Sequence, residues 1–187
     1  MNPCILLVGG SSEIAIECAL IWTRIYKDIT IVLIGRDLAN LKNSENTLFN
    51  NNIDIKVISI ALDCMDIEQI KEIAVDISNN YSIKKILFAI GKMDSDNTVK
   101  GDKDILEING ISPIIFSQTF IPYLNKETHL IFLSSVASER GRKSNFLYGA
   151  GKSMLSTYAE GLQHKYHKKR IYTTLIKLGP TKTSMFY

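Results

Sequence analysis

The sequence predicts an α/β protein whose core is a doubly wound parallel sheet with helices on both faces. Six short apolar runs alternate with stretches of helical periodicity, and several of the runs end in glycine. Runs that are apolar throughout indicate strands buried on both faces, as in parallel sheets. Right-handed crossovers between them predict the strand order 3-2-1-4-5-6, with a ligand crevice at the carboxyl ends of the strands.

Each element is expected from its period and its boundaries. The strands are expected over residues 4–8, 29–34, 55–60, 85–90, 129–134 and 172–178. Helices are expected over residues 12–26, 67–79, about 103–124 and about 148–168, with a more polar helix ending near residue 50. A linker rich in Asp, Asn and Lys covers residues 92–102. A chain of 187 residues is enough for one domain and hardly enough for two, so we expect one domain over residues 1–187.

The composition is that of an ordinary globular protein: 187 residues, 45% of them apolar and 22% charged, with a net charge of +3. A chain of this kind can bury a sizeable core, and disorder is not expected. Much of the basic surplus lies in residues 164–170, near the end of the last expected helix. We interpret this run as a solvated helix C-terminus, with a patch for nucleic acid or anionic lipid as the alternative. We therefore expect no nucleic-acid partner.

The cysteines and the first residues indicate the compartment. Cys4, Cys18 and Cys64 are odd in number and lack the spacing of metal ligands, so we expect buried apolar residues in a reducing compartment and no metal site. The first apolar run has no basic region before it and no cleavage site after it, and it is too short to span a membrane. A cytoplasmic protein without a transmembrane segment is expected.

The turn after the first strand is a candidate phosphate site. Residues 8–15 read Val-Gly-Gly-Ser-Ser-Glu-Ile-Ala and join a strand to a helix. Glycine permits a tight turn, and the helix N-terminus offers free amides and a positive dipole end to a pyrophosphate. Ser11 and Ser12 could donate to phosphate or cap the helix. We expect Gly9, Ser11, Ser12 and Ile14 to bind the cofactor phosphates; a simple turn with a helix cap is the alternative.

Arg36 indicates which dinucleotide would bind. It follows the second strand, where the adenosine ribose of a dinucleotide lies in this architecture. An acidic residue there would bind the ribose hydroxyls, whereas arginine suits a 2′-phosphate. NADP(H) is therefore favoured over NAD(H), with a surface arginine as the alternative. Asp37, one residue later, is expected to cap the following helix.

Tyr148 and Lys152 are candidates for acid–base catalysis. They lie four residues apart, on one face of a helix. A nearby ammonium favours the phenolate and lowers the pKa of tyrosine from about 10. Such a tyrosine can give a proton to a carbonyl that is being reduced or remove one from an alcohol. A surface pair is the alternative, but Ser135 ends the fifth strand at the same edge, where its hydroxyl could bond a substrate carbonyl.

Asn109 is a candidate through Pro113, which lies four residues later in the same helical pattern. Proline has no N–H to donate to the carbonyl four residues earlier. We expect the helix to kink and the freed Asn109 carbonyl to hold a water between Lys152 and solvent, as a proton relay. A kink without a functional role is the alternative.

With these residues the sequence resembles the classical short-chain dehydrogenases/reductases (SDRs) from about Ile5 to Met185. The resemblance implies a Rossmann-type fold and a catalytic tetrad of Asn109, Ser135, Tyr148 and Lys152. It implies that Ser135 orients the substrate, that Tyr148 is the acid/base, that Lys152 also holds the nicotinamide ribose and that Asn109 completes the relay.

The resemblance also implies further cofactor contacts. Asp63 matches the family aspartate that contacts adenine, and Thr183 matches the threonine that contacts the nicotinamide amide. Ala89 and Gly91 stand in the stretch that follows the fourth strand, where the family usually has Asn-Ala-Gly.

Several positions depart from the family pattern. Glu13 and Ala15 stand where the glycine-rich turn has its second and third glycines, and Leu178 replaces the usual proline. Residues 133–148 are similar to a bacterial branch linked to cell-envelope and polysaccharide synthesis, which includes reductases of lipid-linked keto-sugars. Family members continue through a substrate-binding loop, a helix and a seventh strand, so for a sequence stopping at Tyr187 we expect no lid over the crevice and no seventh strand.

The expected function is an NAD(P)(H)-dependent oxidoreductase of a secondary alcohol or ketone, with a sugar or lipid-linked keto-sugar as the suggested substrate. A truncated relative that binds nucleotide, or acts as a subunit without independent catalysis, is the alternative. The resemblance also implies a homodimer formed through helices 103–124 and 148–168.

Overall fold

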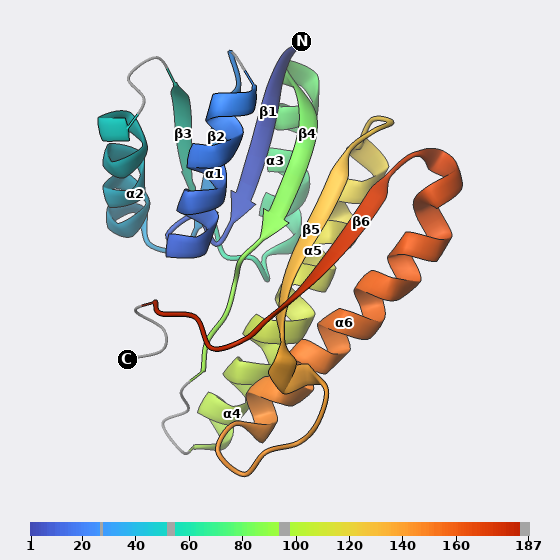
Figure 1. Ribbon diagram of the computed structural model, residues 1–187. Helices are drawn as coiled ribbons and strands as arrows, with labels where there is room; N and C mark the ends of the chain where they lie inside the picture. Colours follow the sequence, from blue (N-terminus) through green and yellow to red (C-terminus); the bar gives the residue numbers. More distant parts are fainter. Residues whose placement is uncertain (27, 52–54, 94–97, 184–187) are drawn as a thin grey trace.

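The computed structural model describes residues 1–26, 28–51, 55–93 and 98–183. These residues form a six-stranded sheet in the order β3-β2-β1-β4-β5-β6. Every neighbouring pair of strands is parallel. The fold class and the strand order predicted from the sequence are therefore confirmed (Figure 1).

The strands are close to those expected from the apolar runs. They are β1 (Asn2–Val8), β2 (Thr30–Gly35), β3 (Lys56–Ala61), β4 (Tyr81–Phe88), β5 (His129–Ser135) and β6 (Tyr172–Leu178). The largest difference is in β4, which begins at Tyr81 because Asn2 of β1 pairs with it; a register irregularity follows between Cys4 and Ile5. The start of β4 is therefore determined by its pairing with β1 and not by the apolar run within β4.

The helical elements include two irregular segments inside one predicted helix. They are α1 (Glu13–Ile25), α2 (Leu38–Asn51), α3 (Ile67–Asn80), α4 (Val99–Leu106), η1 (Glu107–Ile111), α5 (Ser112–Phe120), η2 (Ile121–Tyr123), η3 (Val136–Ser138), α6 (Phe146–Tyr166) and η4 (His167–Lys169). The predicted end of the linker 92–102 was wrong, because α4 already begins at Val99. The Thr98 side chain caps this helix by accepting a hydrogen bond from the Gly101 N–H (3.0 Å). Residues 94–97 of that linker lie outside the described residues.

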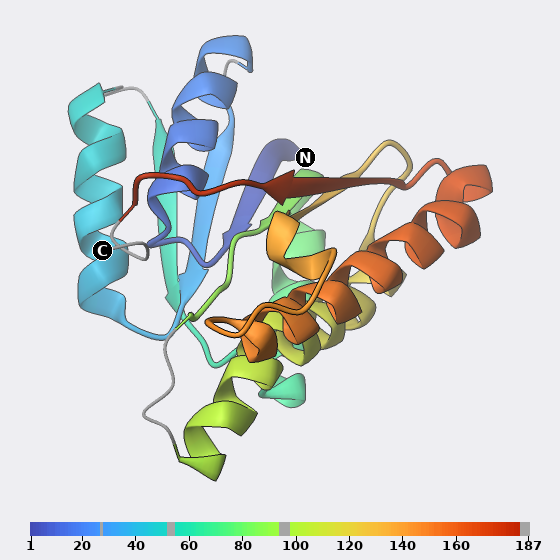
Figure 2. The ribbon, with the colours of Figure 1, turned by 60° about the horizontal axis from the view of Figure 1, so that its bottom comes forward.

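Two hydrophobic layers hold the helices on the sheet. α1 and α2 cover one face, and α3, α5 and α6 cover the other, as Figures 1 and 2 show. The layer under α3, α5 and α6 contains stacked aromatic pairs, Phe88 with Phe132 (ring centroids 4.5 Å apart) and Phe116 with Phe120 (4.7 Å). Aromatic pairs of this kind bury large apolar areas and fix the two elements they join. Phe88 ends β4, so the layer anchors the strand directly before the crevice.

The edge strands are less buried than the sequence predicts. Most of β3 and β6 is half-buried or exposed, whereas β1 and β2 are almost entirely buried. The expectation of burial on both faces was wrong for these two strands because each has a neighbour on one side only. Cys18 is likewise only half-buried, while Cys4 and Cys64 are buried as expected, and burial raises the pKa of both thiols to about 12. Among the helices of the described residues, none combines the length and the apolarity needed to cross a bilayer.

Candidate active site

The carboxyl ends of the strands surround a cavity of about 560 Å³. This volume lies in the range of small-molecule sites, roughly 300–1,000 Å³. Each strand contributes residues at or just after its end, among them Gly9, Gly35, Asp63, Ala89, Ser135 and Leu178. The crevice lies where the strand order predicts it.

The turn between β1 and α1 is tight and depends on glycine. Gly9 has a φ of 92°, and the N–H groups of Gly9 and Gly10 both donate to the Ile34 carbonyl at 2.9 Å. A Cβ on Gly9 would lie 2.8 Å from the carbonyl carbon of Ala89. Glycine is required here both for its backbone conformation and for its close approach to the neighbouring chain.

The start of α1 forms one wall of the cavity. Ser11, Ser12 and Ile14 all line it. The Ser12 side chain caps α1, since its Oγ accepts from the Ala15 N–H at 3.4 Å. Ser12 therefore performs the capping role that the sequence left open, and it also faces the cavity. The helix N-terminus is placed to receive an anion such as a pyrophosphate.

The other expected cofactor residues line the same cavity. Arg36 follows β2 and is exposed, and the predicted capping role of Asp37 is confirmed by hydrogen bonds from Ala39 N–H (2.8 Å) and Asn40 N–H (3.2 Å). Asp63, Ala89, Gly91 and Thr183 also line the cavity. The fold thus brings together donor groups suited to a dinucleotide.

Ser135, Tyr148 and Lys152 converge at the opposite end of the cavity. Ser135 ends β5, and Tyr148 lies half-buried in the first turn of α6. Lys152 lies one turn further along, with its Nζ 5.8 Å from the centroid of the Tyr148 ring. A Cβ on Gly149 would lie 2.6 Å from the Ala137 carbonyl oxygen, so α6 passes directly against η3, which follows Ser135.

Lys152 is almost fully buried, at 3% exposed. Its Nζ donates to the carbonyls of Leu133 (2.9 Å) and Ile90 (3.1 Å), which lie at the ends of β5 and β4. Burial lowers the pKa of Lys152 to about 8. The ammonium therefore joins the two strand ends between which the cavity opens.

The expected lowering of the Tyr148 pKa was wrong. Burial raises the pKa of Tyr148, and a hydrogen bond with Ser135 opposes this shift without cancelling it. The physical reason is that Tyr148 lies half-buried, where desolvation disfavours the phenolate. The Lys152 ammonium, which was expected to favour the phenolate, donates two of its hydrogen bonds to backbone carbonyls instead.

Asn109 lies behind the cavity, in a π-turn that interrupts the predicted helix 103–124. The turn is η1, in which the Ser112 N–H donates to the Glu107 carbonyl five residues back. Extra-residue turns of this kind are frequent at functional sites. The predicted irregularity near Pro113 is thus present, as a π-turn between α4 and α5 rather than a simple kink.

The buried Asn109 side chain ties η1 to the chain that follows β4. Its Nδ2 donates to the carbonyls of Lys92 (2.7 Å) and Ile105 (2.8 Å), and its Oδ1 accepts from the Lys92 N–H at 3.2 Å. A Cβ on Gly151 would lie 2.9 Å from the Asn109 Cβ, so η1 also touches α6 beside Lys152. The role of the Asn109 carbonyl in a relay stays a prediction.

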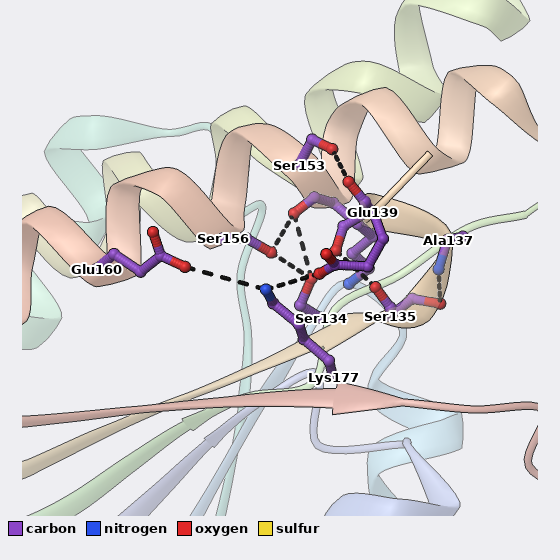
Figure 3. Close-up of polar contacts among 10 residues, drawn as sticks. Ser134, Ser135, Ala137, Glu139, Ser153, Ser156, Glu160 and Lys177 are labelled. Carbon is purple, nitrogen blue, oxygen red and sulfur yellow. Dashed lines mark hydrogen bonds and ion pairs between the residues drawn. The ribbon is translucent and has the colours of Figure 1, made fainter. Parts of the chain in front are cut away.

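A set of serines that the sequence did not single out holds β5 to α6 (Figure 3). The hydroxyls of Ser134 and Ser156 lie 2.7 Å apart, and both donate to the Lys152 carbonyl, at 3.2 and 2.8 Å. Lys152 is therefore bound at both ends, its ammonium by strand carbonyls and its own carbonyl by hydroxyls. The sequence offered one signal for Ser156: it lies four residues after Lys152 and eight after Tyr148, on the same face of the helix.

The segment after Ser135 is held in the same way. The Ser138 hydroxyl donates to the Ser135 carbonyl at 2.6 Å, and the Ser153 hydroxyl donates to the Ser138 carbonyl. Lys177 of β6 forms an ion pair with Glu139 (2.6 Å) and lies 3.9 Å from Glu160. Among the described residues, no group of three or more His, Cys, Asp or Glu side chains is placed to hold a metal ion.

Comparison with known proteins agrees with this geometry. The family model of the short chain dehydrogenases matches residues 3–187. The chain belongs to the short-chain dehydrogenase family. The family predicted from the sequence is thereby confirmed.

Individual relatives are distant in sequence. The mouse protein "Dehydrogenase/reductase SDR family member 7B" (Mus musculus) is 21% identical over 193 residues, which cover 98% of this chain and 59% of that protein. The chain therefore spans 59% of the length of the curated short-chain dehydrogenases it matches.

Solved structures of other short-chain dehydrogenases share the fold. A short chain dehydrogenase of Shigella flexneri, complexed with NADP, is 24% identical with a TM-score of 0.85, and the match covers 98% of this chain and 80% of that one. A short-chain dehydrogenase of Sphingobium yanoikuyae, in complex with NADPH, is 18% identical with a TM-score of 0.83, over 98% of this chain and 73% of that one.

Proposed function

We propose that this short-chain dehydrogenase is an NAD(P)(H)-dependent oxidoreductase that transfers hydride between the nicotinamide cofactor and a secondary alcohol or ketone. The observation that carries the proposal is the convergence of Ser135, Tyr148 and Lys152 at one end of a cavity. The other end of that cavity contains the α1 N-terminus and Arg36.

The lining suits a dinucleotide along its whole length. The α1 turn with Gly9, Ser11, Ser12 and Ile14 would hold the pyrophosphate, and Arg36 would hold a 2′-phosphate. Asp63, Ala89 and Gly91 would contact the adenosine and the middle of the dinucleotide. Thr183 would contact the nicotinamide amide, and Lys152 and Tyr148 would contact the nicotinamide ribose. When bound, the nicotinamide supplies or accepts the hydride.

The protein's own residues would manage the substrate oxygen and its proton. The Ser135 hydroxyl donates to the substrate carbonyl and orients it. Tyr148 gives its proton to that oxygen during reduction and removes it during oxidation. Lys152 supplies positive charge beside the Tyr148 ring, and Asn109 completes the relay that exchanges this proton with solvent.

The test combines cofactor binding with turnover. Titration with NADPH and NADH, followed by nicotinamide fluorescence, should show binding, and a panel of ketones should show oxidation of the bound cofactor. Tyr148→Phe should lower turnover by roughly 10²–10⁴-fold, the usual contribution of a positioned acid/base. Cofactor binding should be retained, weakened by no more than about tenfold, the worth of one neutral hydrogen bond to the ribose.

Tyr158→Phe is the matched control on the same helix. The Tyr158 hydroxyl contacts Ser117 and Gln118, outside the cavity, so its loss should leave turnover unchanged. Unchanged turnover in Tyr148→Phe would contradict the proposal. Cofactor binding without turnover of any ketone by the wild type would support the non-catalytic alternative instead.

The preference for NADP(H) over NAD(H) is part of the proposal and rests on Arg36. The Shigella and Sphingobium structures contain NADP and NADPH, which supports it. Arg36→Gln should weaken NADPH binding by about tenfold to a hundredfold, the worth of a hydrogen bond to a charged group, and leave NADH binding unchanged. Equal affinities of the wild type for NADPH and NADH would contradict this preference.

The finer features suggested by the sequence belong to the same proposal. A keto-sugar or lipid-linked keto-sugar substrate is suggested by the resemblance of residues 133–148. A cytoplasmic location is suggested by Cys4, Cys18 and Cys64, which are free and suit a reducing compartment. A homodimer through helices 103–124 and 148–168 rests on the family resemblance. Keto-sugars should therefore be included in the ketone panel.

A further inference from the structure

We propose that Arg142 binds an anionic group of the substrate, so that the ketone or alcohol carries a carboxylate or a phosphate in addition to its reacting carbon. This inference rests on the proposed function, because it concerns the substrate end of the same cavity. It assigns a substrate class to the site and a role to a residue outside the catalytic tetrad.

Among the cations that the described residues contribute to the cavity, Arg142 alone has no function in the proposed reaction. Among the described residues, the positively charged side chains that line the cavity are Arg36, Arg142 and Lys152. Arg36 lies beyond β2 at the adenosine end, and Lys152 is buried with its Nζ on two carbonyls. Arg142 is half-buried, and its guanidinium has neither a hydrogen bond nor an ion pair within the described parts of the chain.

The position of Arg142 ties it to the reacting end. It lies in the segment between η3 and α6, where the Asn145 N–H donates to the Arg142 carbonyl (3.2 Å) and the Gly149 N–H donates to the Asn145 carbonyl (2.9 Å). This turn leads directly into the first turn of α6, which contains Tyr148. In Figures 1 and 2 the segment lies beside α4 and α6 and away from α2.

The acidic residues near Arg142 are already paired. Glu139, in the same segment, forms its ion pair with Lys177, which holds the pKa of its carboxyl below the usual range. In the lining of the cavity, Asp104 lies 4.0 Å from Lys92 and Glu107 lies 3.3 Å from Lys103. No carboxylate among these competes for Arg142.

This distribution of charge orients the substrate. A carboxylate or phosphate in the cavity would be attracted by the Arg142 guanidinium, which has no carboxylate partner among the described residues. Arginine presents a planar fork of donors that matches both kinds of oxyanion. The anionic group would therefore lie toward the η3–α6 segment while the carbonyl meets Ser135 and Tyr148.

The experiment compares matched ketones with the NADPH-loaded protein. Acetoacetate is compared with its methyl ester, and dihydroxyacetone phosphate with dihydroxyacetone, in the wild type, in Arg142→Gln and in Arg142→Lys. The wild type should prefer an anionic member in kcat/KM. Arg142→Gln should lower kcat/KM for that member by about tenfold to a hundredfold, with Arg142→Lys between the two, and spare the neutral member. The pair that responds shows whether the group is a carboxylate or a phosphate.

A control and a measurement without turnover complete the design. Lys143→Gln removes an exposed neighbouring charge that does not line the cavity, and it should change neither member of a pair. The affinity of the NADP⁺-loaded protein for the anionic ketone, measured by calorimetry, should fall in Arg142→Gln by the same factor as kcat/KM.

The outcomes separate this inference from the proposed function. Turnover of the neutral ketones with no preference for either anionic member, or an equal loss for both members in Arg142→Gln, would overturn the inference and leave the oxidoreductase intact. Absence of NADPH binding, or of turnover and ternary binding with every ketone, would overturn the proposed function and this inference with it.

Discussion

At the scale of single residues, Lys152 links the chemistry of the site to the stability of the fold. Its pKa of about 8 in the folded protein lies below the ordinary lysine value of 10.5, so between these two pH values the unfolded state binds more protons than the folded state. The free energy of unfolding should therefore rise with pH in this window, by at most about 1.4 kcal/mol per pH unit, and the contribution should be flat below pH 8.

Lys152→Met removes this titration and leaves every other ionisable group in place. Urea unfolding of both proteins from pH 7 to pH 10 should show the difference in stability moving in favour of the wild type above pH 8. A difference that stays constant over this range would mean that the ammonium is not held in a desolvated position.

Ser135, Tyr148 and Lys152, which the structure brings together at the cavity, each have a signal in the sequence. Tyr148 and Lys152 share a four-residue spacing, and Ser135 follows an apolar run whose end is predictable. The binding of Lys152 by the carbonyls of Ile90 and Leu133 had no such signal. For the pair of Ser134 with Ser156, the sequence indicates the helix face of Ser156 but not its contact with β5. These contacts depend on the distance between β5 and α6, which packing determines.

At the scale of elements, α6 positions Tyr148 and Lys152 through two close approaches. Gly149 faces the Ala137 carbonyl oxygen, and Gly151 faces Asn109. A side chain at position 149 would force α6 away from η3, because the obstacle is backbone. Gly149→Ala should destabilise the fold by about 1–3 kcal/mol, and a displacement of Tyr148 near 1 Å should lower turnover by about 10²-fold.

Gly161 offers the matched control on the same helix, since a Cβ there would meet nothing within 4 Å. Gly161→Ala should leave turnover unchanged and stabilise the protein by up to about 1 kcal/mol, because alanine has the higher helix propensity. Thermal unfolding and steady-state kinetics of both variants test the contrast. Equal effects of the two substitutions would show that close packing at Gly149 does not position the site.

The elements themselves were predictable to different degrees. The apolar runs identified every strand of the described sheet, and β6 matched its expected range, Tyr172–Leu178. The start of α4 was missed because a single cap, Thr98, begins it inside a polar segment. The π-turn was anticipated only as a break at Pro113, since proline shows where a bond is lost but not which bond replaces it.

At the scale of the whole molecule, the sheet separates two tasks between its two helix layers. In the proposed function, the layer with α1 and α2 would supply the phosphate-binding turn and Arg36, whereas the layer with α5 and α6 would supply the acid–base residues. Both meet at the carboxyl edge of the sheet, so a substrate and a dinucleotide can lie end to end. The outer surfaces of the helices that support the acid–base residues are where we expect a second copy of the chain to bind.

Those outer surfaces lead to a last prediction, that the protein forms a homodimer through helices 103–124 and 148–168. Within the second of these helices the apolar side chain of Met154 is 42% exposed, and Val99, just before the first of them, is 88% exposed. Burial of such side chains would stabilise a dimer by about 25 cal/mol per Å² of apolar surface. The cost of the translational, rotational and side-chain freedom lost on association is subtracted from this. Met154→Glu should therefore shift sedimentation equilibrium toward monomer, and its Tm should lose the dependence on protein concentration that a dimer confers. Ile25→Glu, at an exposed apolar residue of α1 outside these helices, should leave the assembly unchanged. A wild type that sediments as a monomer at all concentrations would contradict the dimer directly, and the site on α6 would then depend on packing within one chain alone.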